Sequence, residues 1–373
     1  MGILNKGDYS ILIVGYDEDN FYIDDNVFNF TVLNETYVLI ADNLTKYYNG
    51  TERFYVTLTH TLNQSVSNKS IAIELNGMNY TVTTNLNGTA SIAINLLSGH
   101  YTAIVRFNEL SITSQITVKP TIYAEDVVKM FLNGTQYYAT FVDTSGNLLV
   151  NTTMTFNING VFYNRKTNGS GVAKLNINLP QGEYVITAKN LVTNEDISNN
   201  VTVLSKIESS NLAKYFKNES QFIVRLLDDT GSYVGANQTA TFNINGNLYT
   251  MRTNETGHAK LNINLPPGNY TITTEYMDCI ESNVVSVISI LNADNLTKQY
   301  GDNSQFVANL VDGQGHPHPN QNVTFNINGV TYRRTTDNNG QAKLNINLPV
   351  GEYIITSTYN DLSISNKIII LSP

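Results

Sequence analysis

The chain has 373 residues and is acidic, with 22 Lys and Arg against 31 Asp and Glu and a formal net charge of −9 at pH 7. Because cations are few, nucleic acids and anionic membrane surfaces are poor partners. The single cysteine, Cys279, excludes an intrachain disulfide and a zinc site built from cysteines. No apolar run approaches the roughly 18 residues of a membrane span, and the first residues lack the apolar core of a secretory signal. We therefore expect any export signal or anchor to lie outside this sequence.

The first 33 residues contain two strand-like segments without the rest of a domain. Residues 7–13 begin with a Gly-x-Tyr motif that recurs in later parts of the chain, and residues 27–33 match a final strand. We predict that 1–33 is the C-terminal two-strand remnant of a truncated repeat. Since an isolated hairpin is only marginally stable, we expect it to be poorly ordered, to dock on its neighbour or to accept strands from another chain.

Acidic residues cluster between these two segments. Calcium takes six to eight oxygen ligands, and the candidate ligands are Asp17, Asp19, Asp24 and Asp25. The glycine and the terminal glutamate of an EF-hand loop are missing, so a solvated acidic loop is the alternative interpretation. We expect no metal at other positions and no cofactor.

Residues 34–373 consist of four repeats. An apolar strand ending in Asn-Gly recurs with glycines spaced by 83, 86 and 83 residues, at Gly77, Gly160, Gly246 and Gly329. The motif Leu-Asn-Ile-Asn-Leu-Pro-x-Gly-x-Tyr occurs at 175–184, 261–270 and 344–353, with a diverged copy at 92–101, and keeps the same spacing. Two markers in one register predict domains at 34–118, 119–205, 206–291 and 292–373.

Within each repeat, apolar and polar residues alternate, as in strands with one buried face. In the second repeat we predict seven strands, at 122–126 together with 127–131, then at 136–143, 153–159, 161–166, 172–179, 184–189 and 200–204. Short strands without helical periodicity indicate an all-β fold, a tandem array of immunoglobulin-like β-sandwiches.

Two recurring features have structural interpretations. The Asn-Gly pairs supply the two positive φ angles of a type I′ hairpin turn. The tyrosine of Gly-x-Tyr stands where sandwich folds place a hydroxyl that ties the preceding corner to the backbone. These tyrosines are Tyr101, Tyr184, Tyr270 and Tyr353.

The connections between repeats are short. The last strand of one repeat runs almost directly into the first of the next, without a Gly/Ser-rich hinge. Such joints predict a stiff, end-to-end rod in which each repeat contacts only its neighbours. At about 3.3 Å per strand residue, we expect about 40 Å per repeat and roughly 150 Å or more in total.

The repeats resemble the immunoglobulin-like repeats of archaeal adhesin-like surface proteins, especially those of methanogens, and more distantly bacterial Ig-like repeats. The resemblance covers about 36–373 and rests on Lys-Tyr-Tyr-x-Gly at 46–50, Asp-x-x-Gly at 143–146, Val-Thr-Phe-x-Ile-Asn-Gly at 323–329 and Leu-Pro-x-Gly-x-Tyr-x-Ile at 348–355. It implies a cell-surface stalk or adhesin without catalytic residues. The first repeat departs most, with His60 where the others have Asp143, Asp228 and Asp312.

The sequence holds 18 Asn-x-Ser/Thr sequons, and several occupy equivalent turns. The candidate glycosylation sites are Asn49, Asn133 and Asn218 in one loop and Asn168 and Asn254 in another. The alternative is that turns favour Asn with Ser or Thr nearby.

Further candidates carry weaker signals. Outward Asn pairs, 157/159 with 176/178 and 243/245 with 262/264, suggest a hydrogen-bonding face for polysaccharide or a solvated strand surface. His316 and His318 offer two imidazoles without an evident third ligand. A recurring pair of an early Lys and a late Asn is reminiscent of the isopeptide cross-links of some surface domains, but a buried catalytic acid is not evident. These residues are Lys46, Lys129, Lys214 and Lys298 with Asn200, Asn283 and Asn366.

Enzyme signatures are missing. No Ser/His/Asp arrangement, phosphate-binding glycine loop or HExxH motif occurs, and the five histidines share no repeat position. The sequence predicts a non-enzymatic, glycosylated, extracellular stalk or spacer at the cell surface that contacts glycans or surface proteins of other cells. The alternative is a carbohydrate-binding module or a wall or S-layer-like structural component.

Overall fold

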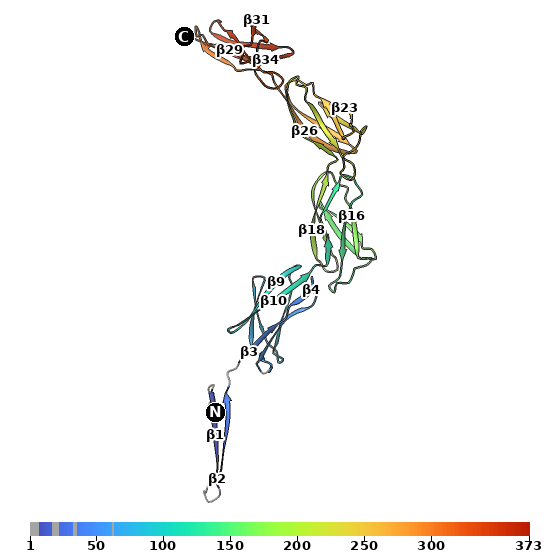
Figure 1. Ribbon diagram of the computed structural model, residues 1–373, viewed down its shortest axis with the longest axis vertical. Coiled ribbons are helices and arrows are strands. Elements are labelled where there is room, and N and C mark those ends of the chain that lie inside the picture. Colours follow the sequence, from blue (N-terminus) through green and yellow to red (C-terminus); the bar gives the residue numbers. More distant parts are fainter. Residues whose placement is uncertain (1–6, 17–21, 33–35, 62) are drawn as a thin grey trace. The chain divides into compact units, whose positions relative to one another are not determined.

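The computed structural model describes residues 7–16, 22–32, 36–61 and 63–373. Their regular elements are all β-strands (Figure 1). No helix long and apolar enough to cross a membrane occurs in these described residues. The all-β prediction is therefore confirmed.

The N-terminal part forms a two-stranded antiparallel hairpin of β1 (Gly7–Tyr16) and β2 (Tyr22–Val32). The strands pair from Gly7 opposite Val32 to Tyr16 opposite Tyr22. Tyr9 and Phe30 lie opposite each other and stack, with ring centroids 5.7 Å apart. Two paired strands are thus present in the described parts of the segments expected at 7–13 and 27–33.

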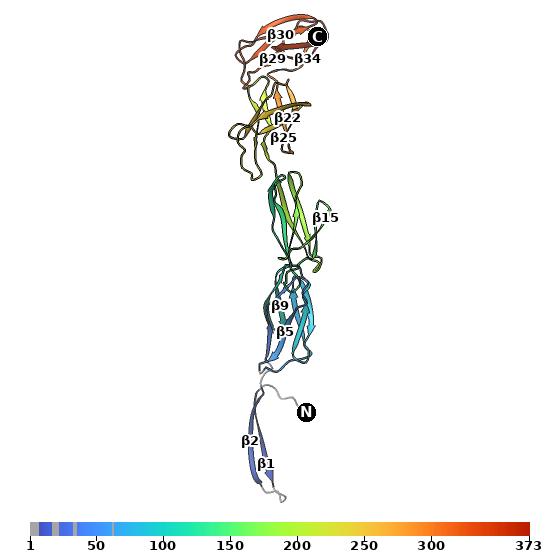
Figure 2. The same ribbon diagram turned by 90° about the vertical axis from the view of Figure 1, so that its right-hand side faces the viewer.

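Each repeat folds into a sandwich of a three-stranded and a five-stranded sheet. In the first, the three-stranded sheet has the order β3 (Tyr37–Ala41), β5 (Arg53–His60), β8 (Thr89–Ala93), and the five-stranded sheet β4 (Leu44–Tyr47), β10 (Leu110–Lys119), β9 (Gly99–Phe107), β6 (Ser70–Leu75), β7 (Met78–Thr83). In Figure 2, β5 and β9 mark the two sheets of this sandwich.

The other three sandwiches repeat the same strand order. The second has β11 (Ile122–Ala124), β13 (Gln136–Phe141), β16 (Val172–Asn176) in one sheet and β12 (Val127–Met130), β18 (Asp196–Leu204), β17 (Gly182–Lys189), β14 (Thr153–Ile158), β15 (Val161–Lys166) in the other. The third has β19 (Ile207–Ser209), β21 (Gln221–Leu226), β24 (His258–Asn262) in its three-stranded sheet. Its five-stranded sheet has β20 (Leu212–Tyr215), β26 (Cys279–Ile288), β25 (Gly268–Tyr276), β22 (Thr239–Ile244), β23 (Asn247–Arg252). The fourth has β27 (Leu291–Ala293), β29 (Gln305–Leu310), β32 (Gln341–Asn345) in its three-stranded sheet. Its five-stranded sheet has β28 (Leu296–Gln299), β34 (Leu362–Leu371), β33 (Gly351–Tyr359), β30 (Asn322–Ile327), β31 (Val330–Thr335).

The first strand of each sandwich differs from the prediction. The segment expected as one strand region, 122–131, is two strands that belong to opposite sheets, β11 and β12. β11 pairs antiparallel with β13, whereas β12 pairs parallel with the last strand, β18, with Val127 opposite Val201. The first strand is thus divided between the two sheets, and in the five-stranded sheet the last strand lies next to the penultimate one. These two features give each repeat an immunoglobulin-like topology. The prediction of tandem immunoglobulin-like sandwiches is confirmed, with eight strands per repeat instead of seven.

The cores follow from the alternation in the sequence. In β14, every second side chain is buried, and Phe156 packs edge-on against Tyr137 with centroids 5.5 Å apart. The fourth sandwich places Phe325 against Phe306 in the same way, at 5.7 Å. Aromatic pairs between facing sheets therefore fill the centre where a disulfide or a tryptophan stands in antibody domains.

Two kinds of glycine turn close the strands. Asn159 and Gly160 join β14 to β15 with φ angles of 53° and 76°, the pair of positive values that a type I′ turn needs. Gly340, before β32, has a φ of 71°, and a Cβ added there would lie 2.3 Å from the carbonyl oxygen of Leu310. Backbone conformation and close approach both require glycine at this second turn.

Contacts divide the chain into two compact units. The first comprises residues 1–126, 136–175 and 184–200, and the second comprises 127–135, 176–183 and 201–373. The boundary between the two units runs through the second repeat. For each contact between repeats that is described below, both residues belong to the same unit.

Candidate functional site

A buried lysine occupies the same place in every sandwich. It lies on the short strand that runs parallel to the last strand, and its side chain is no more than 5% exposed, at Lys46, Lys129, Lys214 and Lys298. Each ammonium group donates to backbone carbonyls. Desolvation by burial lowers the pKa of Lys46, Lys129 and Lys214 below the usual value for lysine.

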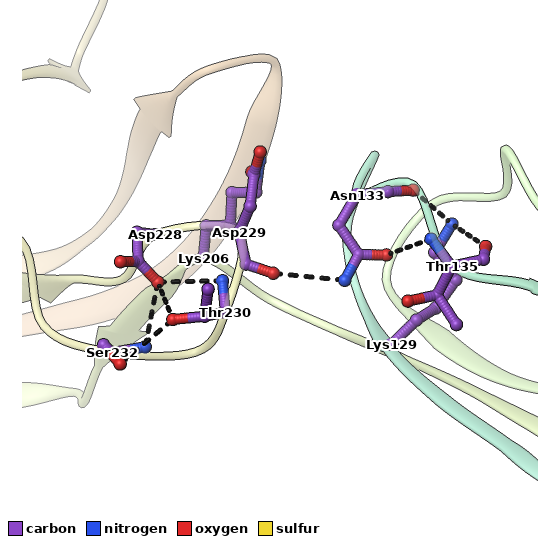
Figure 3. Close-up of polar contacts among 8 residues, drawn as sticks. All are labelled: Lys129, Asn133, Thr135, Lys206, Asp228, Asp229, Thr230 and Ser232. Carbon is purple, nitrogen blue, oxygen red and sulfur yellow. Dashed lines mark hydrogen bonds and ion pairs between the residues drawn. The ribbon is translucent and has the colours of Figure 1, made fainter.

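Lys129 shows what this cation does. Its Nζ donates to the carbonyl oxygens of Asn133 at 2.9 Å and Thr135 at 3.1 Å, on the loop that follows β12 (Figure 3). It also donates to the carbonyl oxygen of Ile177 at 2.6 Å, after β16. One ammonium group therefore fixes two loops of the sandwich. Sequence reasoning singled out these lysines but missed this role, because their partners are backbone atoms that no sequence motif marks.

The structure does not bring the lysines and the late asparagines together as a cross-link would require. Strand register makes Asn199, not Asn200, the equivalent of Asn283 and Asn366, since Val201, Val285 and Ile368 share one position. Asn366 Nδ2 donates to the Ala293 carbonyl at 2.7 Å, on the opposite sheet. The asparagine side chains thus connect the two sheets.

The sequon asparagines fall into two groups. The first group, here called the joint sequons, comprises Asn49, Asn133 and Asn218, in the loop that the buried lysine holds. Asn133 Nδ2 donates to the carbonyl of Asp229 in the next repeat at 3.1 Å, and Asn218 Nδ2 donates to Gly313 at 2.5 Å. Asn49 Nδ2 makes a longer contact with the Thr193 carbonyl, at 3.3 Å.

The second group, the turn sequons, comprises Asn168, in the turn before β16, and Asn254, in the turn before β24. Asn168 Oδ1 accepts the amides of Ser170 and Val172, and Asn254 Oδ1 accepts those of Thr256 and His258. Both side chains are exposed. Among the described residues, the Nδ2 of neither asparagine has a hydrogen-bond partner.

The loops that receive Asn133 and Asn218 are each built around an aspartate. Asp228 Oδ1 accepts the backbone amides of Thr230 at 2.8 Å and Ser232 at 3.0 Å (Figure 3). Asp143 and Asp312 form the same turn. Hydrogen bonds to the ionised carboxylate lower the pKa of all three.

Charged residues that the sequence did not single out lie at the joints. Lys206, whose side chain is 3% exposed, pairs with Asp229 Oδ1 at 2.6 Å. In the first unit, Glu195 is buried, and its carboxylate accepts from Ser98 Oγ at 2.6 Å and from Thr121 Oγ1 at 2.7 Å. The partners of Lys206 and Glu195 are distant in the sequence or belong to a segment of different composition. No motif that recurs between repeats could therefore have revealed these contacts.

Three of the corner tyrosines make the contact that a structural role requires. Their hydroxyls donate to the carbonyl four residues earlier: Tyr101 to Leu97 at 2.8 Å, Tyr270 to Pro266 at 2.7 Å, and Tyr353 to Pro349 at 2.9 Å. Tyr184 stands at the same place in β17. The hydroxyl ties the loop to the penultimate strand.

The metal candidates gain no support. Asp17 and Asp19 lie outside the described residues, and Asp24 and Asp25 are placed only as backbone of β2. No group of three or more His, Cys, Asp or Glu able to hold a metal occurs in the part of the chain that the structure describes. His316 Nδ1 lies 3.5 Å from Asp312 Oδ2, whereas the His318 ring packs edge-on against the Tyr359 ring. The two imidazoles thus have different neighbours.

The proposed asparagine face is wrong as a single surface. Asn157 lies in β14 of the five-stranded sheet, and Asn176 lies in β16 of the three-stranded sheet. Outward side chains of two facing sheets point in opposite directions. The same separation applies to Asn243 in β22 and Asn262 in β24.

No protein-family model and no curated protein matches the sequence. Among solved structures, the chain is similar to a Ca²⁺-stabilised adhesin with which an Antarctic bacterium binds ice, at 13% identity over 90% of this chain and 100% of that one, with a TM-score of 0.18. The I9–I11 tandem of titin has 15% identity over 68% and 100% of the chains, with a TM-score of 0.27. Invasin, a bacterial integrin-binding protein, has 14% identity over 91% and 79%, with a TM-score of 0.22.

Such low scores carry no functional argument. The assignment of the repeats as immunoglobulin-like rests on their strand order and pairing. The expected likeness to archaeal surface proteins and the domain limits at 34–118, 119–205, 206–291 and 292–373 stay predictions.

Proposed function

We propose that this chain is a non-enzymatic, extracellular spacer of a cell-surface, adhesin-like protein, in which four sandwiches and the remnant at 1–33 extend as a stiff stalk. One observation carries the proposal. The polar residues that recur in register hold loops and corners: the buried lysine, the turn aspartate and the corner tyrosine all bond to backbone atoms. These recurring side chains therefore have structural roles within each sandwich.

The pockets are consistent with this view. A groove beside the third and fourth repeats is lined by Phe216, Pro266 and Leu362, with Lys217 and Asp361 bonded to each other. The described residues of its lining include no Ser, Thr, Cys or His side chain, the side chains of a Ser-His or Cys-His pair. Cell-surface glycans, or proteins of other cells, are the proposed contacts of the whole protein, and neighbouring repeats are the proposed contacts of each sandwich.

Small-angle X-ray scattering and a glycan-array screen of the purified chain test this function together. We expect a maximum dimension of roughly 150 Å or more, from about 3.3 Å per strand residue, and no specific glycan binding. Saturable binding of one glycan class would instead favour a carbohydrate-binding module. A compact particle would overturn the stalk.

A further inference from the structure

We propose that glycan attachment and joint closure exclude each other at Asn133 and Asn218, and that the turn sequons Asn168 and Asn254 are glycan acceptors. The inference rests on the proposed surface location, because glycosylation requires it. It goes further by assigning different roles to sequons that look alike in the sequence.

The atom at issue is the amide nitrogen of asparagine. N-glycosylation forms a bond from Nδ2 to the anomeric carbon of a sugar carried by an activated glycosyl phosphate. The phosphate leaves with the electron pair of the broken C–O bond, and Nδ2 loses one proton to a base of the transferring enzyme. The nitrogen must therefore be open to a bulky donor and must have room for a sugar afterwards.

At the joint sequons this nitrogen is already engaged. Asn133 Nδ2 donates to the Asp229 carbonyl across the joint, and Figure 3 shows its amide pointing toward that loop. Its Oδ1 accepts the amide of Thr135 at 3.2 Å, and Lys129 Nζ binds the carbonyls of Asn133 and Thr135, so the side chain is oriented from its own repeat. A sugar on Nδ2 would occupy the space of the following loop.

The third repeat reproduces the arrangement with a different sequon. Asn218 Nδ2 donates to Gly313, Asn218 Oδ1 accepts the amide of Ser220 at 2.7 Å, and Lys214 holds the Ser220 carbonyl at 3.0 Å. The receiving loop is again an aspartate turn, built on Asp312. The sequon is Asn-Gly-Thr at the first of these joints and Asn-Glu-Ser at the second. Because only the asparagine is common to both, the contact depends on the asparagine.

The turn sequons have the opposite environment. The Oδ1 atoms of Asn168 and Asn254 are bonded within their own turns, both side chains are exposed, and Nδ2 makes no bond to any described residue. The Thr256 hydroxyl also donates to Asn254 Oδ1, at 2.9 Å. These nitrogens are open to a donor without disturbing a second repeat.

Paired variants separate the sequon from the contact. In full-length protein from a host that does not glycosylate, spin labels at Lys174→Cys and Lys260→Cys report the distance between the second and third repeats, since both positions are exposed and Cys279 is buried. We expect Asn133→Ala to broaden the distance distribution. Thr135→Ala destroys the sequon but keeps Asn133, and we expect it to leave the distribution unchanged. Equal distributions in the two variants would overturn the joint contact.

Glycopeptide mapping of the protein from a glycosylating host tests the other half. We expect glycan on Asn168 and Asn254 and none on Asn133 and Asn218. Glycan on Asn133 in most molecules, with the label distances of the unmodified protein, would overturn the exclusion. A chain without glycan at any sequon would refute the acceptor assignment, while the scattering experiment would still decide the stalk function independently.

Discussion

The β1–β2 hairpin and the β25–β26 hairpin share one motif and one register but differ in burial. Gly7 lies opposite Val32 and Tyr9 opposite Phe30, just as Gly268 lies opposite Val287 and Tyr270 opposite Val285. Ile11 is nevertheless 50% exposed, whereas its equivalent Ile272 is fully buried. Strand pairing is thus encoded locally, while burial requires the other six strands of a sandwich.

The edges of the two hairpins show the same difference. β25 has β22 on its other side and β26 has β20, whereas β1 and β2 pair only with each other in the sheets described. Ile13 and Phe28 are more than half exposed on the face that would become a core. Within the described residues, unpaired edges and exposed apolar side chains thus distinguish the β1–β2 hairpin from its equivalent in a complete sandwich.

The largest expected effect comes from truncating one aromatic side chain in each region. Phe242→Ala removes a fully buried ring that packs against Phe222, and we expect the third sandwich to lose about 3–5 kcal/mol of unfolding free energy. Phe28→Ala in the hairpin should change no unfolding transition measurably. Urea unfolding followed by tyrosine fluorescence measures both. A comparable loss from Phe28→Ala would mean that the hairpin face is covered in solution.

The next largest effect is expected from the buried lysine Lys214, because a buried lysine occurs in each complete sandwich and not in the described strands of the hairpin. Lys214→Met leaves the carbonyls of Ser220 and Ile263 without their donor, and we expect a loss of about 2 kcal/mol. Lys260→Met, on the exposed face of β24, is the control and should stay within about 0.5 kcal/mol. Thermal unfolding of both variants makes the comparison. Equal melting temperatures would show that the ammonium group contributes nothing net.

A smaller, stabilising effect is expected at the position where the hairpin carries Phe28. Complete sandwiches have a polar residue there, and Asn199 Oδ1 accepts the Tyr137 hydroxyl at 2.8 Å. Asn366 Oδ1 is buried without a partner, and Phe306 stands where the second sandwich has Tyr137. Phe306→Tyr should therefore supply the missing donor and stabilise the fourth sandwich by about 1 kcal/mol.

Calorimetry tests this substitution. Tyr137→Phe is the reciprocal change and should destabilise the second sandwich by a similar amount, because it orphans Asn199 Oδ1. Destabilisation by both substitutions would show that the fourth core has no room for a hydroxyl.

The smallest effect is the response to acid. Because the pKa of Asp228 is lower in the folded state than in the unfolded chain, its ionisation contributes stability above the unfolded value of about 3.9, and this stability is lost as the pH falls through the lower folded value. Asp228→Asn keeps the acceptor oxygen of the turn. We expect it to reduce the acid sensitivity of the third sandwich between pH 4 and pH 2 in urea titrations. An unchanged pH dependence would contradict the assignment.

The period-two alternation, the Asn-Gly turns and the repeat spacing made the sandwich predictable. The division of the first strand was not predictable, since Glu125 and Asp126 between its halves carry no turn motif and both halves read as strand. The asparagine face failed because alternation assigns a residue to a side of its strand but not to one of two sheets. The contact from Asn133 to Asp229 spans 96 residues, beyond any local pattern.

The parallel pairing of β20 with β26 has a mechanical consequence. The chain enters a sandwich near β20 and leaves it from β26, and these strands run side by side in the same direction, from Leu212 opposite Val285 to Tyr215 opposite Ile288. Tension on the two ends pulls the strands past each other along their length, so the bonds between them are loaded together instead of opening one at a time. A sandwich built this way is suited to resist stretching along its length.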